Sequence, residues 1–166
     1  MLNIAVSETV HAPIERVFEI ASDVPNCASF IEGIAYIETI TQASPSADNI
    51  GPVGVGYAWR EARIMFGKKA VEEMAITKWS PPNSYTVEAR SHGSHYLTEI
   101  TFVQIENQND KPTTRMTMSF AATPETFMAK VMMKVFAFMS KTLVKCITND
   151  LRDIKVAAEA DQPNLP

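Results

Sequence analysis

The chain has 166 residues, of which 46% are hydrophobic, and a formal net charge of −4. This length and composition fit one domain with its own hydrophobic core. Because the lysines and arginines are scattered, the charge pattern argues against a nucleic-acid partner. The N-terminus MLNIAVSETV lacks the features of a secretory signal, and no apolar run approaches the roughly 20 residues that cross a bilayer. We therefore expect a cytoplasmic protein without a membrane span.

The two cysteines, Cys27 and Cys146, stand alone in the sequence. Neither belongs to a C-x-x-C motif or to any spacing typical of a zinc site. In a reducing compartment both remain free thiols, whereas an oxidising compartment allows them to pair. We expect free thiols, no bound metal and no cofactor.

The first quarter of the chain predicts alternating strands and short helices. Hydrophobic residues alternate in the first segment, interrupted by Glu8, which is typical of a strand, and recur at helical spacing after Pro13. The predicted elements, in chain order, are a strand containing Ile4, Val6 and Val10, a helix at about 13–22, a second short helix that ends at Gly33, and a strand at 35–42.

The stretch GPVGVGYAWREAR at 51–63 contains three glycines in six positions. A phosphate-binding loop requires a helix directly after its glycines and usually a Gly-Lys-Ser/Thr motif, and both are missing here. A turn at Gly51 and Pro52 that opens a strand explains the pattern better. The glycines then indicate a bulge, a bend or the close approach of another backbone segment.

The middle of the chain predicts a series of strands separated by short turns. Short connections between successive strands imply antiparallel pairing, so these strands form a meander. The predicted strands lie at about 54–65, 69–79, 84–91, 95–106 and 113–121.

After Pro124 the hydrophobic pattern changes from alternation to helical spacing. Steps of three and four residues predict a single amphipathic helix of about 34 residues. An isolated helix with one apolar stripe needs a surface to pack on, and the meander is large enough to supply it. The stripe comprises Met128, Met132, Val135, Met139, Leu143, Ile147, Leu151 and Ile154. The tail at 161–166 is expected to be frayed.

This succession of elements is an α+β arrangement, and it resembles the SRPBCC superfamily of helix-grip proteins, which includes the birch-pollen allergens, START domains and polyketide cyclase/dehydrase-like proteins. The likeness is carried by VHAPIERVFEIASDVPNCASFIEGI at 10–34, GPVGVGYAWREAR at 51–63, ITKWSPPNSYTVEAR at 76–90 and the closing helix. The resemblance implies a curved seven-stranded antiparallel sheet wrapped around the C-terminal helix, in a single domain at 1–160. It also implies a cavity for hydrophobic or amphipathic ligands, without a shared catalytic residue.

Four residues with chemical potential alternate along the predicted strand at 54–65. Tyr57, Trp59, Glu61 and Arg63 share one face of a regular strand. If that face is the inner one, the two charges must pair with each other, meet other polar groups or orient a ligand. Glu61 is then the first candidate for acid/base catalysis, and Arg63 for anchoring a ligand carboxylate or enolate. The simpler interpretation is a bulge that switches the phase, or a place at the open end of the strand.

A second group of candidates is apolar and would line the interior. Methionine adapts equally well to an irregular ligand and to an irregular gap, so ordinary core packing explains the same pattern and is the simpler interpretation. The candidate lining residues are Tyr96, Met116, Met118, Phe120, Met128, Met132 and Met139.

His92 and His95 lie in a predicted turn, SHGSH. A zinc site needs a third protein ligand, which this spacing does not supply, so a solvated turn is the better interpretation and no metal is expected. Three functions remain open: binding of a small hydrophobic molecule such as a lipid, polyketide-like or isoprenoid compound, catalysis of the cyclase/dehydratase kind, and a protein-interaction module. We favour ligand binding, with the oligomeric state open.

Overall fold

The computed structural model describes residues 1–65, 67–105, 111–131 and 140–160. Its elements confirm the expected α+β order, with strand boundaries within a few residues of those predicted. They are β1 (Leu2–Val10), α1 (Ile14–Ser22), the 3-10 helix η1 (Val24–Ser29), β2 (Ile34–Thr41), β3 (Ala58–Met65), β4 (Lys68–Ser80), β5 (Ser84–Ser91), β6 (Ser94–Ile105), β7 (Thr113–Pro124) and α3 (Ser140–Ala160). A short helical segment at 127–131, called here the 127–131 turn, follows β7.

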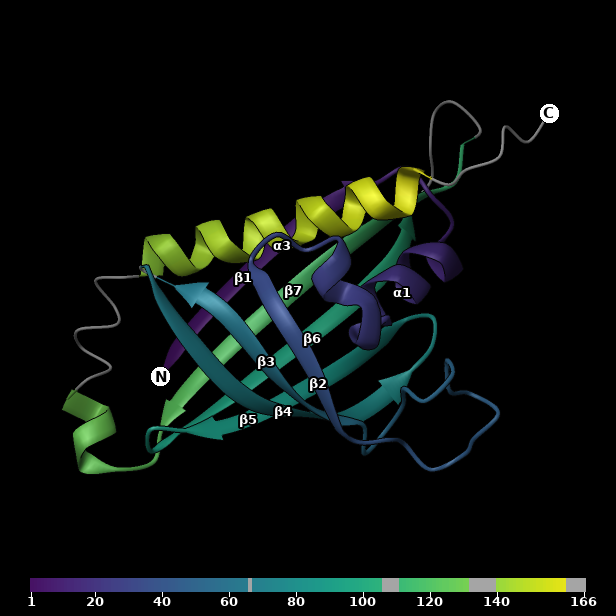
Figure 1. Ribbon diagram of the computed structural model, residues 1–166. Helices are drawn as coiled ribbons and strands as arrows, with labels where there is room; N and C mark the ends of the chain where they lie inside the picture. Colours follow the sequence, from purple (N-terminus) through teal and green to yellow (C-terminus); the bar gives the residue numbers. More distant parts are fainter. Residues whose placement is uncertain (66, 106–110, 132–139, 161–166) are drawn as a thin grey trace.

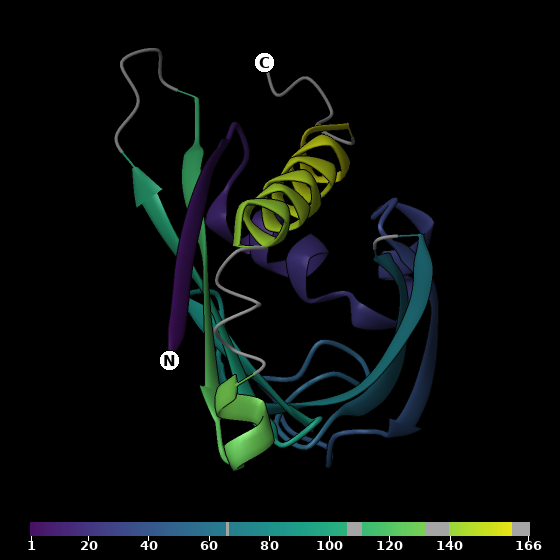
Figure 2. The ribbon, with the colours of Figure 1, turned by 90° about the vertical axis from the view of Figure 1, so that its left-hand side faces the viewer.

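All seven strands form one antiparallel sheet in the order β1-β7-β6-β5-β4-β3-β2. The sheet curls, and α3 lies across its hollow side while α1 and η1 cover one end (Figure 1). Figure 2, which looks at the molecule from the left-hand side of that view, shows the strands bending round below α3. This is the expected helix-grip arrangement.

The phase of β1 identifies the concave face of the sheet. Lys155 on α3 forms an ion pair with Glu8 on β1, with 3.0 Å between Nζ and Oε1. Glu8 therefore points toward the helix. Because side chains alternate along a strand, Ile4 and Val6 point the same way, in the phase that the sequence predicts.

An aromatic cluster closes the end of the concave face beneath α1. The ring of Phe18 on α1 makes edge contacts with Trp79, Phe102 and Tyr85 at centroid distances of 5.0, 5.4 and 5.9 Å. The hydroxyl of Tyr85 donates a hydrogen bond to the carbonyl of Ala21 at 2.6 Å. These contacts hold α1 against the sheet, and this end is filled by side chains.

The predicted C-terminal helix differs in form from the expectation. Its described helical residues are the 127–131 turn and α3, and the two do not share an axis (Figures 1 and 2). The prediction of one helix of about 34 residues is therefore wrong. The predicted buried stripe is confirmed on α3 for Ile147, Leu151 and Ile154. No helix in the described ranges is long and apolar enough to cross a membrane.

The glycine-rich stretch before β3 is a tight turn. A Cβ atom added to Gly54 would lie 2.1 Å from Oδ1 of Asn49, and Gly56 has φ +89°, a conformation that favours glycine. The turn predicted at Gly51 is confirmed, but the close neighbour of Gly54 is the side chain of Asn49 and not another backbone segment. The strand itself begins at Ala58, four residues later than predicted at 54, because these turns occupy the intervening residues.

Candidate functional site

The buried charges of β3 lie on the inner face of an unbroken strand. The pairing of β3 with β4 is continuous from Ala58 to Met65. The interpretation that a bulge switches the phase of Glu61 and Arg63 is therefore wrong. The irregularities fall in the pairing of β2 with β3 and of β4 with β5, where the partner strands absorb the curvature of the sheet.

Four side chains form a connected network, called here the Glu61 network. Arg63 donates from Nε to the Glu61 carboxylate and pairs through Nη1 with Asp150 on α3, 2.8 Å from Oδ2. The indole Nε1 of Trp59 donates to Oε2 of Glu61 at 3.3 Å. Glu61 is only 6% exposed and Asp150 7%. These charges are buried and paired, rather than placed at an open strand end.

The network contains two buried carboxylates and one guanidinium. Burial raises the pKa of Asp150, and the negative charge of Glu61 acts in the same direction. Arg63 only partly offsets these two effects, so the pKa is about 6. Burial alone would lower the pKa of Arg63, but attraction from Glu61 and Asp150 outweighs it and raises that pKa. Arg63 therefore stays charged, and Asp150 is the group of this pair that takes up a proton in mild acid.

Asp150 is the member of the Glu61 network that the sequence did not reveal. It follows Ile147 by three positions and precedes Ile154 by four, so it lies within the buried stripe of α3. A single acid in an apolar stripe was the available signal. Its partner on β3 is distant in sequence, and no local pattern pairs the two.

The structure places three of the predicted lining residues in the closed core. Tyr57 and Met116 have no exposed surface, and Trp59 is 3% exposed. The hydroxyl of Tyr57 shares a 2.8 Å hydrogen bond with Oγ1 of Thr39 on β2. These side chains are packed as ordinary core residues, so they reach a ligand only through rearrangement of their surroundings.

Other apolar residues of the concave face remain partly exposed. Phe120 is opposite Ile4, and Met118 is opposite Val6, across the pairing of β1 with β7. The ring of Tyr96 stacks on Phe120 with 6.0 Å between centroids. We call this group the concave patch; its half-buried members are Ile4, Val6, Tyr96, Met118, Phe120 and, from α3, Leu143.

Met128, another of the predicted lining residues, does not join the concave patch. Met128 is 68% exposed on the 127–131 turn, where Ala129 takes the buried position, so its predicted place in a sheet-facing stripe is wrong. Met132 and Met139 lie outside the described residues.

The two histidines of the β5–β6 hairpin lie apart. His92 is exposed in the turn with φ 50°, and His95 forms a 2.8 Å bond from Nε2 to Glu88 Oε2. The hydrogen bond from His95 lowers the pKa of Glu88. Within the described ranges, no three His, Cys, Asp or Glu side chains gather as a metal site would require.

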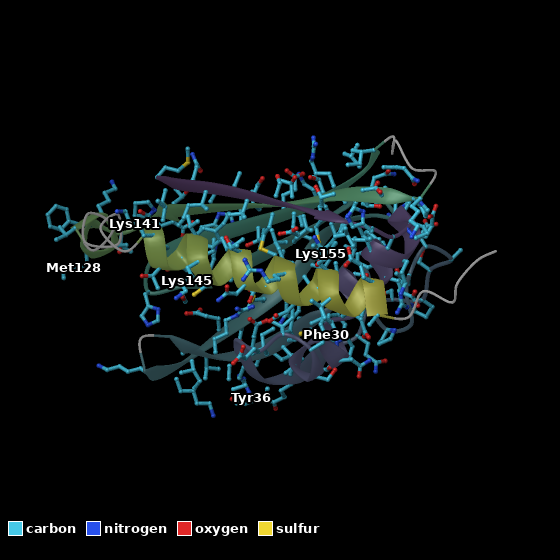
Figure 3. The ribbon with its side chains drawn as sticks, turned by 90° about the horizontal axis from the view of Figure 1, so that it is seen from above. Phe30, Tyr36, Met128, Lys141, Lys145 and Lys155 are labelled. Carbon is cyan, nitrogen blue, oxygen red and sulfur yellow. The ribbon has the colours of Figure 1, made fainter. Side chains whose placement is uncertain are left out.

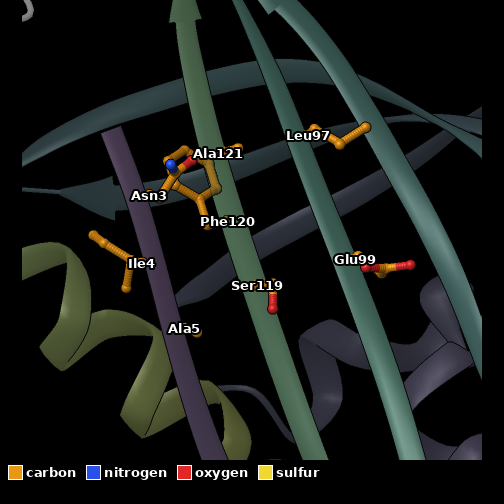
Figure 4. A pocket seen from close by; sticks show the side chains of 8 residues that line it. All are labelled: Asn3, Ile4, Ala5, Leu97, Glu99, Ser119, Phe120 and Ala121. Atoms are coloured by element: carbon orange, nitrogen blue, oxygen red, sulfur yellow. The ribbon is translucent and has the colours of Figure 1, made fainter. Parts of the chain in front are cut away.

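A shallow depression of about 380 Å³ lies on the outer face of the sheet (Figure 4). Most residues that line it, among them Asn3 and Ala5 on β1, are in the phase opposite to Glu8, so the depression lies on the outer face; Ile4 and Phe120 are the lining residues that it shares with the concave patch. The depression is lined by Asn3, Ile4, Ala5, Leu97, Glu99, Ser119, Phe120 and Ala121.

Comparison with a family of known proteins gives a match over almost the whole chain. The family described as polyketide cyclase / dehydrase and lipid transport matches residues 1–159. No curated protein sequence matches the chain.

Solved structures share the fold at low sequence identity. TTHA0849 from Thermus thermophilus has a TM-score of 0.70 and 16% identity, over 98% of this chain and 100% of that one. The Zhui aromatase/cyclase from Streptomyces sp. R1128 has a TM-score of 0.65 and 13% identity, over 95% and 93%. The di-domain ARO/CYC BexL from the BE-7585A biosynthetic pathway has a TM-score of 0.65 and 13% identity, over 98% of this chain and 52% of that one.

Proposed function

The chain belongs to the polyketide cyclase / dehydrase and lipid transport family, and from this premise we propose that it binds a small hydrophobic or amphipathic molecule between α3 and the curved sheet. A lipid, a polyketide-like compound or an isoprenoid would fit this description. The observation that carries the proposal is the concave patch, an apolar surface that water still reaches. Covering it with a ligand removes that apolar area from water, at about 25 cal/mol per Å².

The proposed position of the ligand follows from which part of the concave face is already filled by side chains. The aromatic cluster around Phe18 occupies the end beneath α1. The ligand therefore lies toward the other end, over Phe120 and Tyr96 on the sheet and beside Leu143 on the helix. The tyrosine hydroxyl supplies a polar contact that orients an amphipathic molecule.

Arg63 is the charged member of the Glu61 network that stays partly exposed, and it can meet a polar group of a ligand that reaches β3. Its partners Glu61 and Asp150 are almost fully buried, whereas 26% of the Arg63 side chain is exposed. A guanidinium that is held from two sides keeps a fixed direction, which favours recognition of a carboxylate or an enolate oxygen.

Titration with the fluorescent probe 1-anilinonaphthalene-8-sulfonate tests the proposal. Leu143→Trp places a larger side chain within the concave patch, and we expect it to weaken probe binding about tenfold, the effect of losing roughly 1.4 kcal/mol of apolar contact. Val103→Trp is the matched control, because Val103 is an exposed residue of β6 outside the patch. Probe binding that is absent, or equal in both variants, would overturn the proposal.

A second candidate function is catalysis of the cyclase/dehydratase kind, favoured by the two aromatase/cyclases of similar fold. Glu61 is the acid/base candidate, although both of its carboxylate oxygens already accept hydrogen bonds. Native mass spectrometry of protein from its source cells identifies a retained molecule. If that molecule is converted by the wild-type protein and not by Glu61→Gln, the chain is an enzyme; conversion by neither leaves a binding protein.

A further inference from the structure

The 127–131 turn presents large apolar side chains to solvent. Phe127 is 77% exposed, Met128 68% and Val131 47%, while Ala129 between them is buried. Single exposed apolar residues are common on proteins, but three on one short turn form a concentrated apolar tip. Such a tip indicates a surface that is covered in use.

This turn is held to the sheet by backbone hydrogen bonds. The amides of Glu125 and Thr126 both donate to the carbonyl of Gly93 in the β5–β6 hairpin, at 2.8 and 3.2 Å. Oγ1 of Thr126 accepts a bond from the amide of Ala129 at 3.2 Å. The exposed side chains are therefore carried by a segment that is fixed at the end of β7.

The stretch of sequence from the turn to the first half of α3 is basic, in contrast to the acidic chain as a whole, and Glu125, which directly precedes this stretch, pairs with Arg90 at 3.7 Å. Residues 126–149 contain four lysines and no aspartate or glutamate, which leaves 11 basic and 19 acidic residues elsewhere, from totals of 15 and 19. Lys130, Lys141 and Lys145 are exposed. Seen from above, Met128, Lys141 and Lys145 lie toward the same end of the molecule (Figure 3).

The same end of the molecule carries the start of α3 (Figure 1). Figure 2 shows the 127–131 turn and the first turn of α3 facing the viewer together. We call this surface the basic apolar end; its residues are Phe127, Met128, Lys130, Val131, Lys141 and Lys145.

We propose that the basic apolar end docks on an anionic lipid bilayer, with Phe127, Met128 and Val131 entering the headgroup region. The lysines then lie beside the acidic headgroups, which attract basic residues near the surface. An apolar tip with lysines at the same end of the molecule has the composition of interfacial membrane anchors. An acidic protein partner would satisfy the lysines equally, but three adjacent apolar side chains on a protruding turn fit a fluid interface better than a fixed pocket. The docking does not depend on ligand binding at the concave patch.

Vesicle flotation of the whole chain tests this docking. We expect binding to phosphatidylcholine vesicles that contain about one-third phosphatidylserine, little binding to pure phosphatidylcholine, and weaker binding as salt shortens the roughly 10 Å screening length. Phe127→Ser combined with Met128→Ser should reduce binding at least about tenfold, because two apolar side chains no longer leave water. Lys141→Glu combined with Lys145→Glu should abolish the preference for anionic vesicles.

Matched controls use residues away from this end with similar exposure. Val103→Ser combined with Val156→Ser removes two exposed apolar side chains, and Lys78→Glu combined with Arg152→Glu makes the same change of charge. Both controls should bind vesicles as the wild type does. Thermal unfolding of every variant establishes that each one is folded.

Three results would overturn the proposal: no vesicle binding, binding that is indifferent to the serine pair at Phe127 and Met128, or equal losses in the controls. Concentration-dependent self-association that the serine pair abolishes, without vesicle binding, would instead make this end a contact between copies of the chain. Because the probe titration at the concave patch is a separate measurement, either proposal can fail alone.

Discussion

Arg63 on β3 pairs with Asp150 on α3, with 2.8 Å between Nη1 and Oδ2, and this contact joins the helix to the far part of the sheet. The other flank of α3 is tied to β1 by Lys155 and Glu8. Further bonds run from the Glu32 amide to Asp153 at 3.0 Å and from the His11 amide to Glu159 at 2.8 Å. All of these ties lie at 150–159, so the C-terminal half of α3 is anchored on both sides.

Removing Arg63 should destabilise the fold strongly. Arg63→Met leaves Glu61 and Asp150 as two buried carboxylates without a cation, and breaking a buried ion pair in this way costs about 3–5 kcal/mol. Urea unfolding at pH 7 measures the loss in the free energy of unfolding. Lower pH should restore part of it, because protonation removes the unpaired charges.

Arg60 provides the matched control for this measurement. It pairs with Glu38 at 2.8 Å and Glu73 at 2.6 Å, but on the exposed face of β3. Exposed ion pairs contribute about 0–1 kcal/mol, so Arg60→Met should change stability little. Equal losses for the two arginines would contradict the claim that burial of the Glu61 network matters.

The pH dependence of stability should contain a contribution from Asp150. Its folded-state pKa of about 6 lies above the ordinary value of 3.8, so the folded chain holds this proton more tightly than the unfolded chain. The resulting stabilisation is complete below pH 3.8 and is lost as the pH rises through 6. Asp150→Asn removes this titration.

Urea unfolding of Asp150→Asn and the wild type at several pH values between 4 and 7 measures this contribution. The stability of the variant relative to the wild type should rise with pH, by a total on the order of 3 kcal/mol. A constant difference across this range would show that Asp150 has the same pKa in both states.

The favoured interpretation of the charges on β3, a bulge or an open strand end, was wrong, and the alternative based on regular alternation describes the local part of the site. Alternation placed Trp59, Glu61 and Arg63 on one face of β3, and the pairing constraint on buried charges required partners for them. The identity of the third partner did not follow. Asp150 meets Arg63 only because α3 crosses the concave face, and that crossing depends on long-range packing.

The C-terminal helix shows a second limit of prediction from the sequence pattern. A stripe with steps of three and four residues describes one long helix, and it equally describes two helical segments that follow each other. The sequence contains no glycine or proline between Met128 and Leu143 to mark a break. The tertiary position of the 127–131 turn, bonded to the β5–β6 hairpin, decides where Met128 lies.

Cys27 should react far more slowly than Cys146. Burial, together with the nearby charge of Glu61, raises the pKa of the Cys27 thiol to about 12, whereas Cys146 is half-buried. At pH 8 only about one Cys27 in 10⁴ is then a thiolate, which is the reactive form. Labelling with 5,5′-dithiobis(2-nitrobenzoate) should modify Cys146 first. The variant Cys146→Ser should label slowly when native and quickly in concentrated urea; equally fast labelling in both conditions would contradict this prediction.

The close contact between Gly54 and Asn49 predicts a coupled pair of mutations. In Gly54→Ala the new Cβ would lie 2.1 Å from Oδ1 of Asn49, whose Nδ2 donates to the carbonyl of Ser44 at 2.7 Å. The asparagine must move and lose that bond, so we expect a loss of about 1–2 kcal/mol in the free energy of unfolding.

In the Asn49→Ala background the obstacle to the new methyl group is gone. Gly54→Ala should then be neutral or should stabilise the chain by about 0.5 kcal/mol, because alanine restricts the unfolded chain more than glycine does. Urea unfolding of the two single variants and the double variant gives the coupling energy. An unchanged cost of Gly54→Ala in both backgrounds would mean that the strain lies in the backbone of the turn, and not in the contact with Asn49.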